Sequence, residues 1–313
     1  MRKVNLPTER DFDRARVAVR HHLRPTPLLP LPGNRWLKLE SQQPSGAFKV
    51  RGAVAALSRL PKGTRLVTAS AGNHAIGVAW AAANLGHHAT IVVPATASPR
   101  KLDILHDMGA NVLAVGESFE DAEAHALQLA SEGLIYISPY NDPHVIAGQG
   151  TIVDELVSQI EGDFTIVVPV GGGGLISGVA MRAAAVKDRT ISVIGVEASA
   201  SQAVSASVAV GHVVDVEVGD TLADGLAGNL EPGSITVDIL AKFRPTFMTV
   251  DETEITAAIR KLYRDHDLTA EGAAAASFAA MQHIRLETPV VGLLTGRNIS
   301  TETLNRIVSN TGR

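Results

Sequence analysis

The sequence predicts an α/β protein with two open parallel sheets, each covered by helices on both faces so that it forms a three-layer domain. Short apolar runs alternate with longer Ala-rich amphipathic stretches along the chain, which is typical of strand-helix alternation. The apolar runs contain no regular polar positions, and this pattern indicates strands that are buried on both faces. A length of 313 residues suggests about two domains of this kind.

The first set of elements is a β-α-β unit that repeats three times between residues 65 and 137. We expect its strands at 65–69, 89–93, 111–115 and 134–137, and its helices at 73–85, 99–108 and 119–130. Gly86 stands where a left-handed residue would end the first of these helices. Ser98 is a candidate N-cap, and Pro99 follows it in the first helical position.

The second set of elements begins near residue 146. Its strands are expected at 164–168, 191–196 and 289–294, and its helices at 146–160, 175–185, 252–264, 272–284 and from 298 onward. Residues 30–60 do not belong clearly to the first set, so one domain is expected to be discontinuous. We predict a large domain of residues 1–62 and 142–313 and a small domain of residues 63–141.

The composition excludes several classes of protein. The net charge is −4, from 28 basic and 32 acidic residues, and this balance argues against a nucleic-acid partner. The absence of cysteine excludes disulfides, thiolate metal sites and cysteine nucleophiles. No apolar run reaches the roughly 18 residues of a membrane helix, and the charged N-terminus lacks the core of a signal peptide. We therefore expect a cytoplasmic enzyme that does not bind membranes.

Lys49 is the first candidate for chemistry. It lies in the stretch PSGAFKVRGA at residues 44–53, which follows an expected strand at 36–39 and opens a helix. A lysine at the positive end of a helix dipole is unfavourable when charged, and burial adds to this effect. Both effects lower the pKa of the amine and favour the neutral, nucleophilic form that a Schiff base requires. The alternative is a solvated lysine in a loop.

Two further turns could bind anions. SAGNH at residues 70–74 lies between a strand and a helix, where free backbone N–H groups can hold a carboxylate. Four consecutive glycines at residues 171–174 also join a strand to a helix, and their backbone could wrap a phosphate. The alternatives are an N-cap with a tight turn for the first and a purely structural turn for the second.

The glycine loop does not match either common nucleotide motif. The dinucleotide fingerprint needs glycine at offsets 0, 2 and 5, and no start within residues 171–173 meets it. The P-loop needs Gly-Lys-Ser/Thr, but Val179 follows Gly178. Glu197 ends the next strand and could act as a ribose-binding acid, so a nicotinamide cofactor stays an alternative.

The last candidate is LTGRN at residues 294–298, where the final strand meets a helix. Ligands of open α/β sheets bind at the carboxyl ends of strands, so Thr295 would present a neutral hydroxyl there. An ordinary helix entry is the alternative. Metal and catalytic-triad sites are not expected, because the His-His pairs at 21–22 and 87–88 cannot share a helix face and no Gly-x-Ser-x-Gly occurs.

Taken in this order, these stretches resemble the pyridoxal-phosphate enzymes of the tryptophan-synthase-β fold type. The chain is most similar to threonine/serine dehydratases and serine racemases, and the resemblance runs from about Arg24 to Asn298. Supporting stretches are RPTPL at residues 24–28, VIAGQGT at 145–151 and ADG at 223–225. One motif alone would be weak, but Lys49, the Gly-Asn-His turn and the glycine loop are specific together.

The resemblance implies a role for each motif. Lys49 corresponds to the lysine that holds pyridoxal 5'-phosphate as a Schiff base and then acts as the general base. Glu271 resembles the acid near the cofactor ring, with an ordinary surface glutamate as the alternative. The remaining cofactor contacts would come from Phe48, Asn73, Gly171, Gly172, Gly173, Gly174, Leu175 and Thr295. The substrate carboxylate would be bound by Ser70, Ala71, Gly72 and His74.

The implied reaction is a β-elimination of a β-hydroxy amino acid such as L-threonine or L-serine. Lys49 takes the α-proton, the cofactor stores the negative charge, and its phosphate protonates the leaving hydroxyl. The released enamine hydrolyses to a 2-oxo acid and ammonia. A hydroxyl such as that of Thr295 at the pyridine nitrogen favours prompt elimination over transamination. A homodimer is expected, by resemblance only.

Several positions depart from the family pattern. Ala71 stands where racemases carry a second serine base, so racemisation should be poor. Glu197 matches the acid of the racemase metal site, but Ala203 replaces its aspartate, so no metal is predicted. Arg297 replaces a common glycine and Ser138 a common histidine, and both could reshape the substrate end. Only fifteen residues follow Asn298, so isoleucine feedback is not expected.

Other functions stay open. A racemase, a β-replacement enzyme or a dehydratase of the hydroxyectoine-breakdown type would share this fold. A non-catalytic protein that binds pyridoxal phosphate belongs to a different class, and it would be coloured by the cofactor but release no 2-oxo acid.

Overall fold

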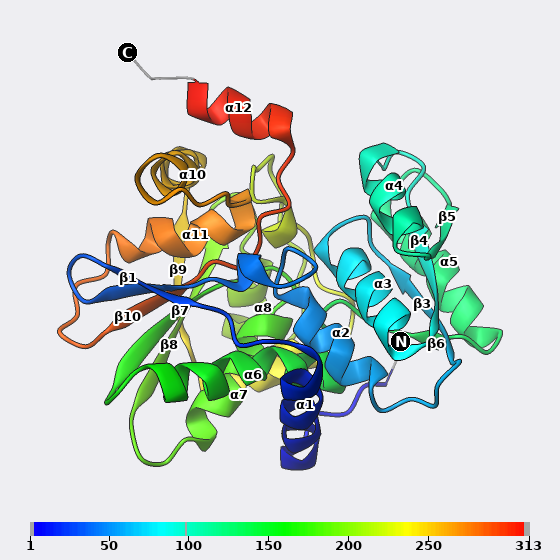
Figure 1. Ribbon diagram of the computed structural model, residues 1–313, viewed down its shortest axis with the longest axis horizontal. Helices are drawn as coiled ribbons and strands as arrows, with labels where there is room; N and C mark the ends of the chain where they lie inside the picture. The colour runs from blue at the N-terminus through cyan, green and yellow to red at the C-terminus, as the bar shows by residue number, and fades with distance from the viewer. Residues whose placement is uncertain (1–2, 98, 310–313) are drawn as a thin grey trace.

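Two separate sheets form the framework of the protein, as Figure 1 shows with the larger sheet on the left and the smaller on the right. The structure is a computed structural model and describes residues 3–97 and 99–309, so the predicted N-cap Ser98 lies outside the described residues. The strands of the smaller sheet all fall between residues 65 and 136, whereas the larger sheet takes strands from both sides of that segment. The division into domains of residues 63–141 and of residues 1–62 with 142–313 stays a prediction.

The larger sheet has six strands in the order β1-β2-β10-β7-β8-β9. Its strands are β1 (Leu28–Leu31), β2 (Arg35–Lys38), β7 (Phe164–Pro169), β8 (Ile191–Ala198), β9 (Thr246–Val250) and β10 (Val290–Leu293). All neighbouring pairs are parallel except β1 with β2. Only three residues join these two strands, and so short a hairpin loop forces an antiparallel pair. Gly33 (φ 79°) and Asn34 (φ 57°) make the turn.

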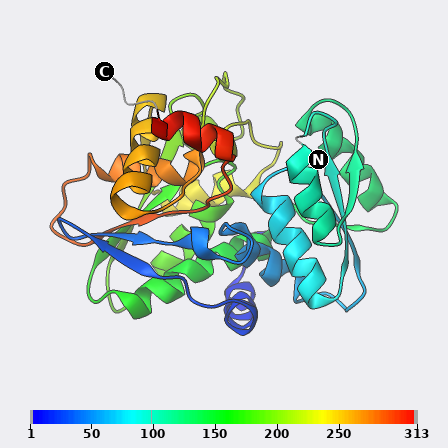
Figure 2. The same ribbon diagram turned by 45° about the horizontal axis from the view of Figure 1, so that its top comes forward.

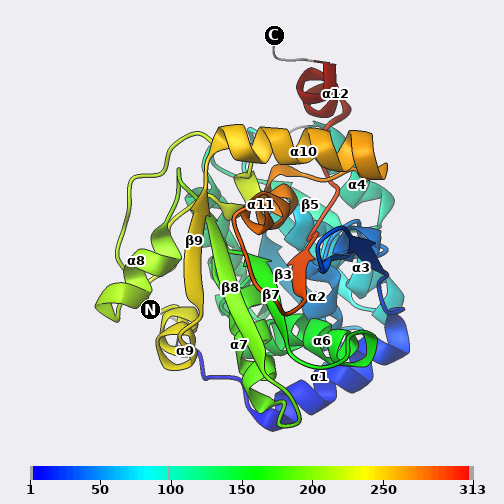
Figure 3. The same ribbon diagram turned by 90° about the vertical axis from the view of Figure 1, so that its left-hand side faces the viewer.

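Helices cover both faces of this sheet, as Figure 3 shows with α6 and α7 on one side and α10 and α11 on the other. Neighbouring side chains of a strand point to opposite faces. Ile166 and Val168 of β7 accordingly share a core cluster with α6 and α7, whereas Val167 between them packs with α10 and α11. The helices are α6 (Pro143–Gln159), α7 (Gly174–Ala185), α10 (Glu252–His266) and α11 (Gly272–Met281).

The smaller sheet has four parallel strands in the order β5-β4-β3-β6. Leu66 of β3 packs with α3 on one face, and Val67 packs with α5 on the other. This sheet is therefore a second three-layer unit, as predicted. Its elements are β3 (Arg65–Ala69), α3 (Asn73–Leu85), β4 (His88–Val93), α4 (Pro99–Asp107), β5 (Asn111–Ala114), α5 (Phe119–Ser131) and β6 (Ile135–Tyr136).

Helix α2 (Lys49–Leu57) packs against α3 of the smaller unit and against α6 of the larger. Glycines permit this close approach. A Cβ at Gly77 of α3 would lie 3.0 Å from Val50 N, and one at Gly148 of α6 would lie 2.6 Å from Arg51 O. The start of α2 is thus held between the two units, and its first residue is Lys49.

Several elements were not predicted. They are α1 (Glu9–His22), α8 (Ala203–Val210), α9 (Ile235–Phe243), the strands β1 and β9, and the short turns η1 (Glu40–Gln42) and η2 (Asp224–Leu226). Helix α1 carries a capping box between Thr8 and Asp11, a signal that the sequence contained. The last helix, α12 (Thr301–Ser309), lies on α10 in Figure 2 and begins three residues after the predicted start.

Within residues 3–97 and 99–309, no helix combines the length and the apolar character that crossing a membrane requires.

Candidate active site

Lys49 lies at the first position of α2, and its side chain is partly buried. Its Nζ donates a hydrogen bond to Pro139 O at 2.9 Å and lies 5.3 Å from the centre of the Phe48 ring. Pro139 belongs to the segment that follows β6, so the amine reaches from α2 to the edge of the smaller unit. One carbonyl acceptor fixes the amine without neutralising its charge.

Burial is the main reason why the pKa of Lys49 falls from 10.5 to about 8. The carboxylate of Glu271 opposes this shift, because a nearby negative charge favours the ammonium form. The ammonium form of Lys49 therefore still predominates at pH 7, and the unprotonated amine becomes the major form only above about pH 8. The sequence predicted this direction, and burial is its largest cause.

Asn73, Glu271 and Asn298 form a hydrogen-bonded chain beside this lysine. Asn73 Nδ2 donates to Glu271 Oε1 at 2.6 Å, and Asn298 Nδ2 donates to Asn73 Oδ1 at 2.6 Å and to Ser45 O at 3.1 Å. The chain joins residues that lie 198 to 253 positions apart in sequence. Both ends of the Asn73 amide are thus engaged within the protein, so contact with a cofactor oxygen would require this amide to exchange a partner.

His74 lies beneath the same turn and is buried. Its Nε2 lies 3.1 Å from Ile137 O, and its Nδ1 has no hydrogen-bond partner among the described residues. Burial first, and then the charge of Lys49, lower its pKa from 6.5 to about 3. His74 is therefore a neutral imidazole that donates to a backbone carbonyl, and its predicted contact with a substrate stays a prediction.

The turn between β3 and α3 contains the rest of the predicted substrate residues. Ser70 Oγ accepts a hydrogen bond from Gly72 N at 3.1 Å, and Gly72 caps α3 without a side chain. Ser70, Ala71 and Gly72 are all partly exposed. The first amides of a helix have no intrahelical acceptor, and they carry the positive end of the helix dipole. This turn can therefore bind a carboxylate.

The glycine loop joins β7 to α7, and Gly173 (φ 82°) caps the helix. A Cβ at Gly171 would lie 2.5 Å from Gly225 O, and one at Gly172 would lie 2.4 Å from the Tyr140 ring. Side chains are thus excluded at both positions because neighbouring segments pack directly onto the backbone. Leu175 lies buried in the first turn of α7. The loop presents backbone groups at a helix N-terminus, which suits a phosphate.

Thr295 follows β10 and is buried. Its carbonyl accepts a hydrogen bond from Phe48 N at 2.9 Å, and Ala47 forms a β-bridge with Gly296. A Cβ at Gly296 would lie 2.0 Å from Glu271 Oε1. The Thr295 segment and the Lys49 segment are therefore tied together by their backbones.

Pro139 and Tyr140 were missed by the sequence analysis. Pro139 holds Lys49 Nζ, and Tyr140 packs on the glycine loop while its hydroxyl accepts from Glu231 N at 2.7 Å. One short segment therefore contacts two predicted motifs. No local signal marked it, because both contacts depend on where distant glycines allow the backbone to approach.

The structure also shows the surroundings of the positions compared above with the family pattern. Glu197 is buried, and its Oε1 accepts from Val204 N at 3.0 Å and Ser205 N at 3.2 Å at the start of α8. Ala203 is the first residue of that helix. Ser138 is buried, and its Oγ accepts from Asn141 N at 3.1 Å. Arg297 is exposed.

The chain matches one family model and several curated proteins. The model of the pyridoxal-phosphate dependent enzymes matches residues 19–296, which include every predicted site residue. L-threonine ammonia-lyase of Thermotoga maritima is 39% identical over 284 residues, which are 88% of this chain and 70% of that protein. The catabolic L-threonine dehydratase of Escherichia coli is 35% identical over 289 residues, which are 90% of this chain and 86% of that protein.

Solved structures resemble the whole fold. The processed form of threonine deaminase isoform 2 from Solanum lycopersicum has a TM-score of 0.87 at 31% identity and covers 99% of this chain and 96% of its own. Maize serine racemase has a TM-score of 0.88 at 29% identity, with 96% of this chain and 97% of its own covered. These structures share the arrangement of two sheets described above.

Proposed function

Because this chain belongs to the family of pyridoxal-phosphate dependent enzymes, we propose that it is an ammonia-lyase for a β-hydroxy amino acid. The substrate would be L-threonine, L-serine or a related compound, and the products would be a 2-oxo acid and ammonia. One observation carries the proposal: the amine of Lys49, with a pKa of about 8, is held by Pro139, whose neighbour Tyr140 packs on the glycine loop, and its charge acts on His74 in the first turn of α3. The names of the related ammonia-lyases support the choice of reaction.

The residues present fit the cofactor. Lys49 offers a primary amine with a pKa of about 8. The glycine loop at the start of α7 offers backbone groups at positions where no side chain fits. Lys49 and Phe48, Asn73, Thr295 and residues 171–175 would hold the cofactor. When bound, pyridoxal phosphate supplies an electron sink for the bond that breaks at the substrate's α-carbon.

The chain's own groups would do the rest. The turn at residues 70–72 would bind the substrate carboxylate through the first amides of α3. Lys49 Nζ would take the proton from the α-carbon, because a base with a pKa near the working pH transfers protons efficiently. Neutral His74 leaves no second cation beside this amine. Loss of the β-hydroxyl as water and hydrolysis of the released enamine then give the 2-oxo acid and ammonia.

A panel assay tests the proposal directly. The protein, purified with vitamin B6 supplied, is incubated with L-threonine, L-serine and other β-hydroxy amino acids, and release of 2-oxo acid is measured. We expect turnover of at least one of them at about 1 s⁻¹ or faster, the common range for enzymes. A yellow protein that releases no 2-oxo acid from any of these compounds would instead be a non-catalytic binding protein.

The pH dependence of kcat should report on Lys49. Activity is expected to rise with pH around a midpoint near 8, because only the unprotonated amine can accept a proton. Replacing Glu271 by glutamine removes the charge that raises the pKa of Lys49, so the midpoint should move to lower pH. Glu132→Gln, on the exposed end of α5, is the control and should leave the midpoint unchanged. An unchanged midpoint in Glu271→Gln would contradict the assignment of Lys49 as the base.

Racemisation is the second candidate function, because the fold matches a serine racemase as closely as a threonine deaminase. Ala71 has no proton to give from the face opposite Lys49. We expect D-amino acid to form at least about a hundred times more slowly than 2-oxo acid, which is the low end of what a positioned acid-base group contributes. Chiral chromatography of the reaction measures this ratio. Equal amounts of the two products would favour the racemase.

The assembly and location of the enzyme stay predictions. We expect a homodimer, on the basis of the resemblance, and light scattering of the purified chain would measure it. A cytoplasmic location is likewise an expectation, and fractionation of the source cells would test it.

A further inference from the structure

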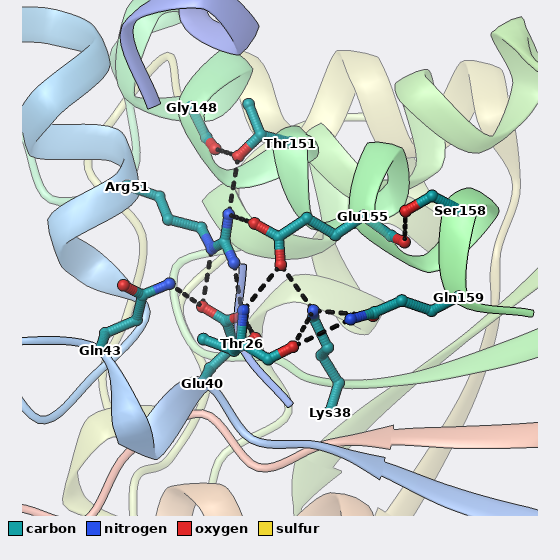
Figure 4. Close-up of polar contacts among 10 residues, drawn as sticks. All are labelled: Thr26, Lys38, Glu40, Gln43, Arg51, Gly148, Thr151, Glu155, Ser158 and Gln159. Atoms are coloured by element: carbon teal, nitrogen blue, oxygen red, sulfur yellow. Dashed lines mark hydrogen bonds and ion pairs between the residues drawn. The ribbon is translucent and has the colours of Figure 1, made fainter. Parts of the chain in front are cut away.

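A network of four charged side chains is buried between β2, η1, α2 and α6, as Figure 4 shows. The side chains of Lys38, Glu40 and Arg51 are fully buried, and that of Glu155 is 14% exposed. Two positive and two negative charges balance. The proposed reaction uses none of these residues, yet Arg51 lies only two residues after Lys49.

Arg51 donates four hydrogen bonds within this network. Its Nε and Nη2 donate to the two carboxylate oxygens of Glu40 at 2.7 and 2.8 Å, and its Nη1 donates to Glu155 Oε1 at 2.7 Å and to Thr151 Oγ1 at 3.3 Å. The planar guanidinium thus binds one carboxylate with two parallel bonds and reaches a second on α6. Lysine cannot reproduce this geometry, because its ammonium is a single point.

Lys38 completes the network from β2. Its Nζ donates to Glu155 Oε2 at 2.5 Å, to Thr26 O at 2.8 Å and to Gln159 Oε1 at 2.9 Å. Thr26 Oγ1 in turn donates to Glu40 Oε1 at 2.7 Å. The network therefore joins β2, which precedes the Lys49 segment in sequence, to α6.

The network holds the start of α2, which has no side-chain cap of its own. Phe48 occupies the N-cap position, and no side chain there accepts a hydrogen bond from the helix. The backbone of Lys38 accepts from Leu294 N at 3.0 Å, and Ser41 N donates to Leu294 O at 2.9 Å. The network is therefore also linked to the residue before Thr295. A displacement of Arg51 would therefore change the positions of both Lys49 and Thr295.

We propose that Arg51, clamped by Glu40 and Glu155, is a positioning residue that fixes the first turn of α2 and thereby keeps Lys49 Nζ in its place and shielded from water. The proposal deepens the proposed function, since it rests on Lys49 as the base. Arg51 would touch neither substrate nor cofactor and would act through Lys49.

If the first turn of α2 is loosened, water should reach the amine of Lys49. Burial is what lowers the pKa of Lys49, so hydration should raise it toward its ordinary value. The charge that acts on this amine is that of Glu271 at the start of α11, and His74 on α3 faces it as a neutral imidazole. Neither belongs to the network, so a change at Arg51 should reach Lys49 through its position alone.

The test compares Arg51→Lys with Arg182→Lys. Arg182 on α7 pairs with Asp154 of α6 at 2.8 Å, next to Glu155 in sequence but outside the network. Acetylation of Lys49 in the full-length chain, stripped of cofactor, is followed against pH by peptide mass spectrometry. The pH profile of kcat and the Tm of the loaded enzyme are measured beside it.

We expect Arg51→Lys to move the Lys49 labelling midpoint up by about one pH unit, and to lower kcat at pH 7 about tenfold. Arg182→Lys should lower Tm and leave the midpoint in place. If Arg51→Lys lowers Tm but keeps the wild-type labelling midpoint, the network only stabilises the fold, and the proposal is overturned.

A second variant tests the proposal in case Arg51→Lys does not fold. Thr151→Val removes the hydrogen bond from Arg51 Nη1 and changes no charge, so it should fold and move the midpoint in the same direction by a smaller amount. An unchanged midpoint in Thr151→Val, when Arg51→Lys does not fold, overturns the proposal as well. If no amino acid is turned over but the midpoint moves, the proposed function fails and the positioning role stands.

Discussion

Replacing Lys49 by alanine is expected to lower the rate of 2-oxo acid release by about a thousandfold or more, because the chain loses both its covalent anchor and its base. Lys49 combines a pKa near 8 with a hydrogen bond to Pro139, whose neighbour Tyr140 packs on the glycine loop. The measurement is kcat on whichever amino acid the panel identifies. Borohydride reduction of the wild-type enzyme, followed by peptide mass mapping, should leave a pyridoxyl group on Lys49.

The matched control for this change is Lys261→Ala. Lys261 is exposed on α10, so its removal should leave activity and cofactor attachment unchanged. A label on another lysine, or activity retained in Lys49→Ala, would refute the assignment of the catalytic amine.

Gly171→Ala is expected to weaken cofactor binding about tenfold to a hundredfold. The new Cβ would lie 2.5 Å from Gly225 O, so the glycine loop must shift away from the position in which its amides converge. Loss of one hydrogen bond to a charged phosphate costs about 1.5–3 kcal/mol, which corresponds to this range of affinity. The dissociation constant, measured by absorbance during reconstitution, reports the effect.

Gly219→Ala is the control for this substitution. A Cβ there meets its first neighbour at 3.5 Å, which is ordinary contact, and its φ is not in the left-handed region. The control should bind cofactor like the wild type. Equal affinity of all three proteins would mean that residues 171–174 do not hold the phosphate.

The alternation of apolar runs and amphipathic stretches was sufficient to predict most of the fold. The predicted helix at 73–85 and strand at 65–69 have the observed bounds, because β3 is apolar on both faces and Gly86 (φ 75°) ends α3. The α/β class with parallel sheets is confirmed. The edge strands β1 and β9 were missed because β1 has only four residues and contains a proline, and because threonines interrupt the apolar residues of β9.

The site was predicted less completely. Motifs with their own local signal, such as the glycine loop and Lys49 at a helix start, were found in the sequence. Pro139 and Tyr140 had none, because their contacts depend on how the segment after β6 meets α2 and α7. The hydrogen bonds of Asn73 to Glu271 and Asn298 also join residues that no spacing rule relates.

Residue type and local order determined what chemistry this protein can carry: a lysine opening a helix, glycines where no side chain is tolerated, and a hydroxyl after the last strand. The tertiary structure decided how far the pKa of that lysine falls and which partners hold it. Burial and charge act through space, and they depend on segments that the chain order keeps apart. The pairing of Arg51 with Glu40 and Glu155 is of this second kind.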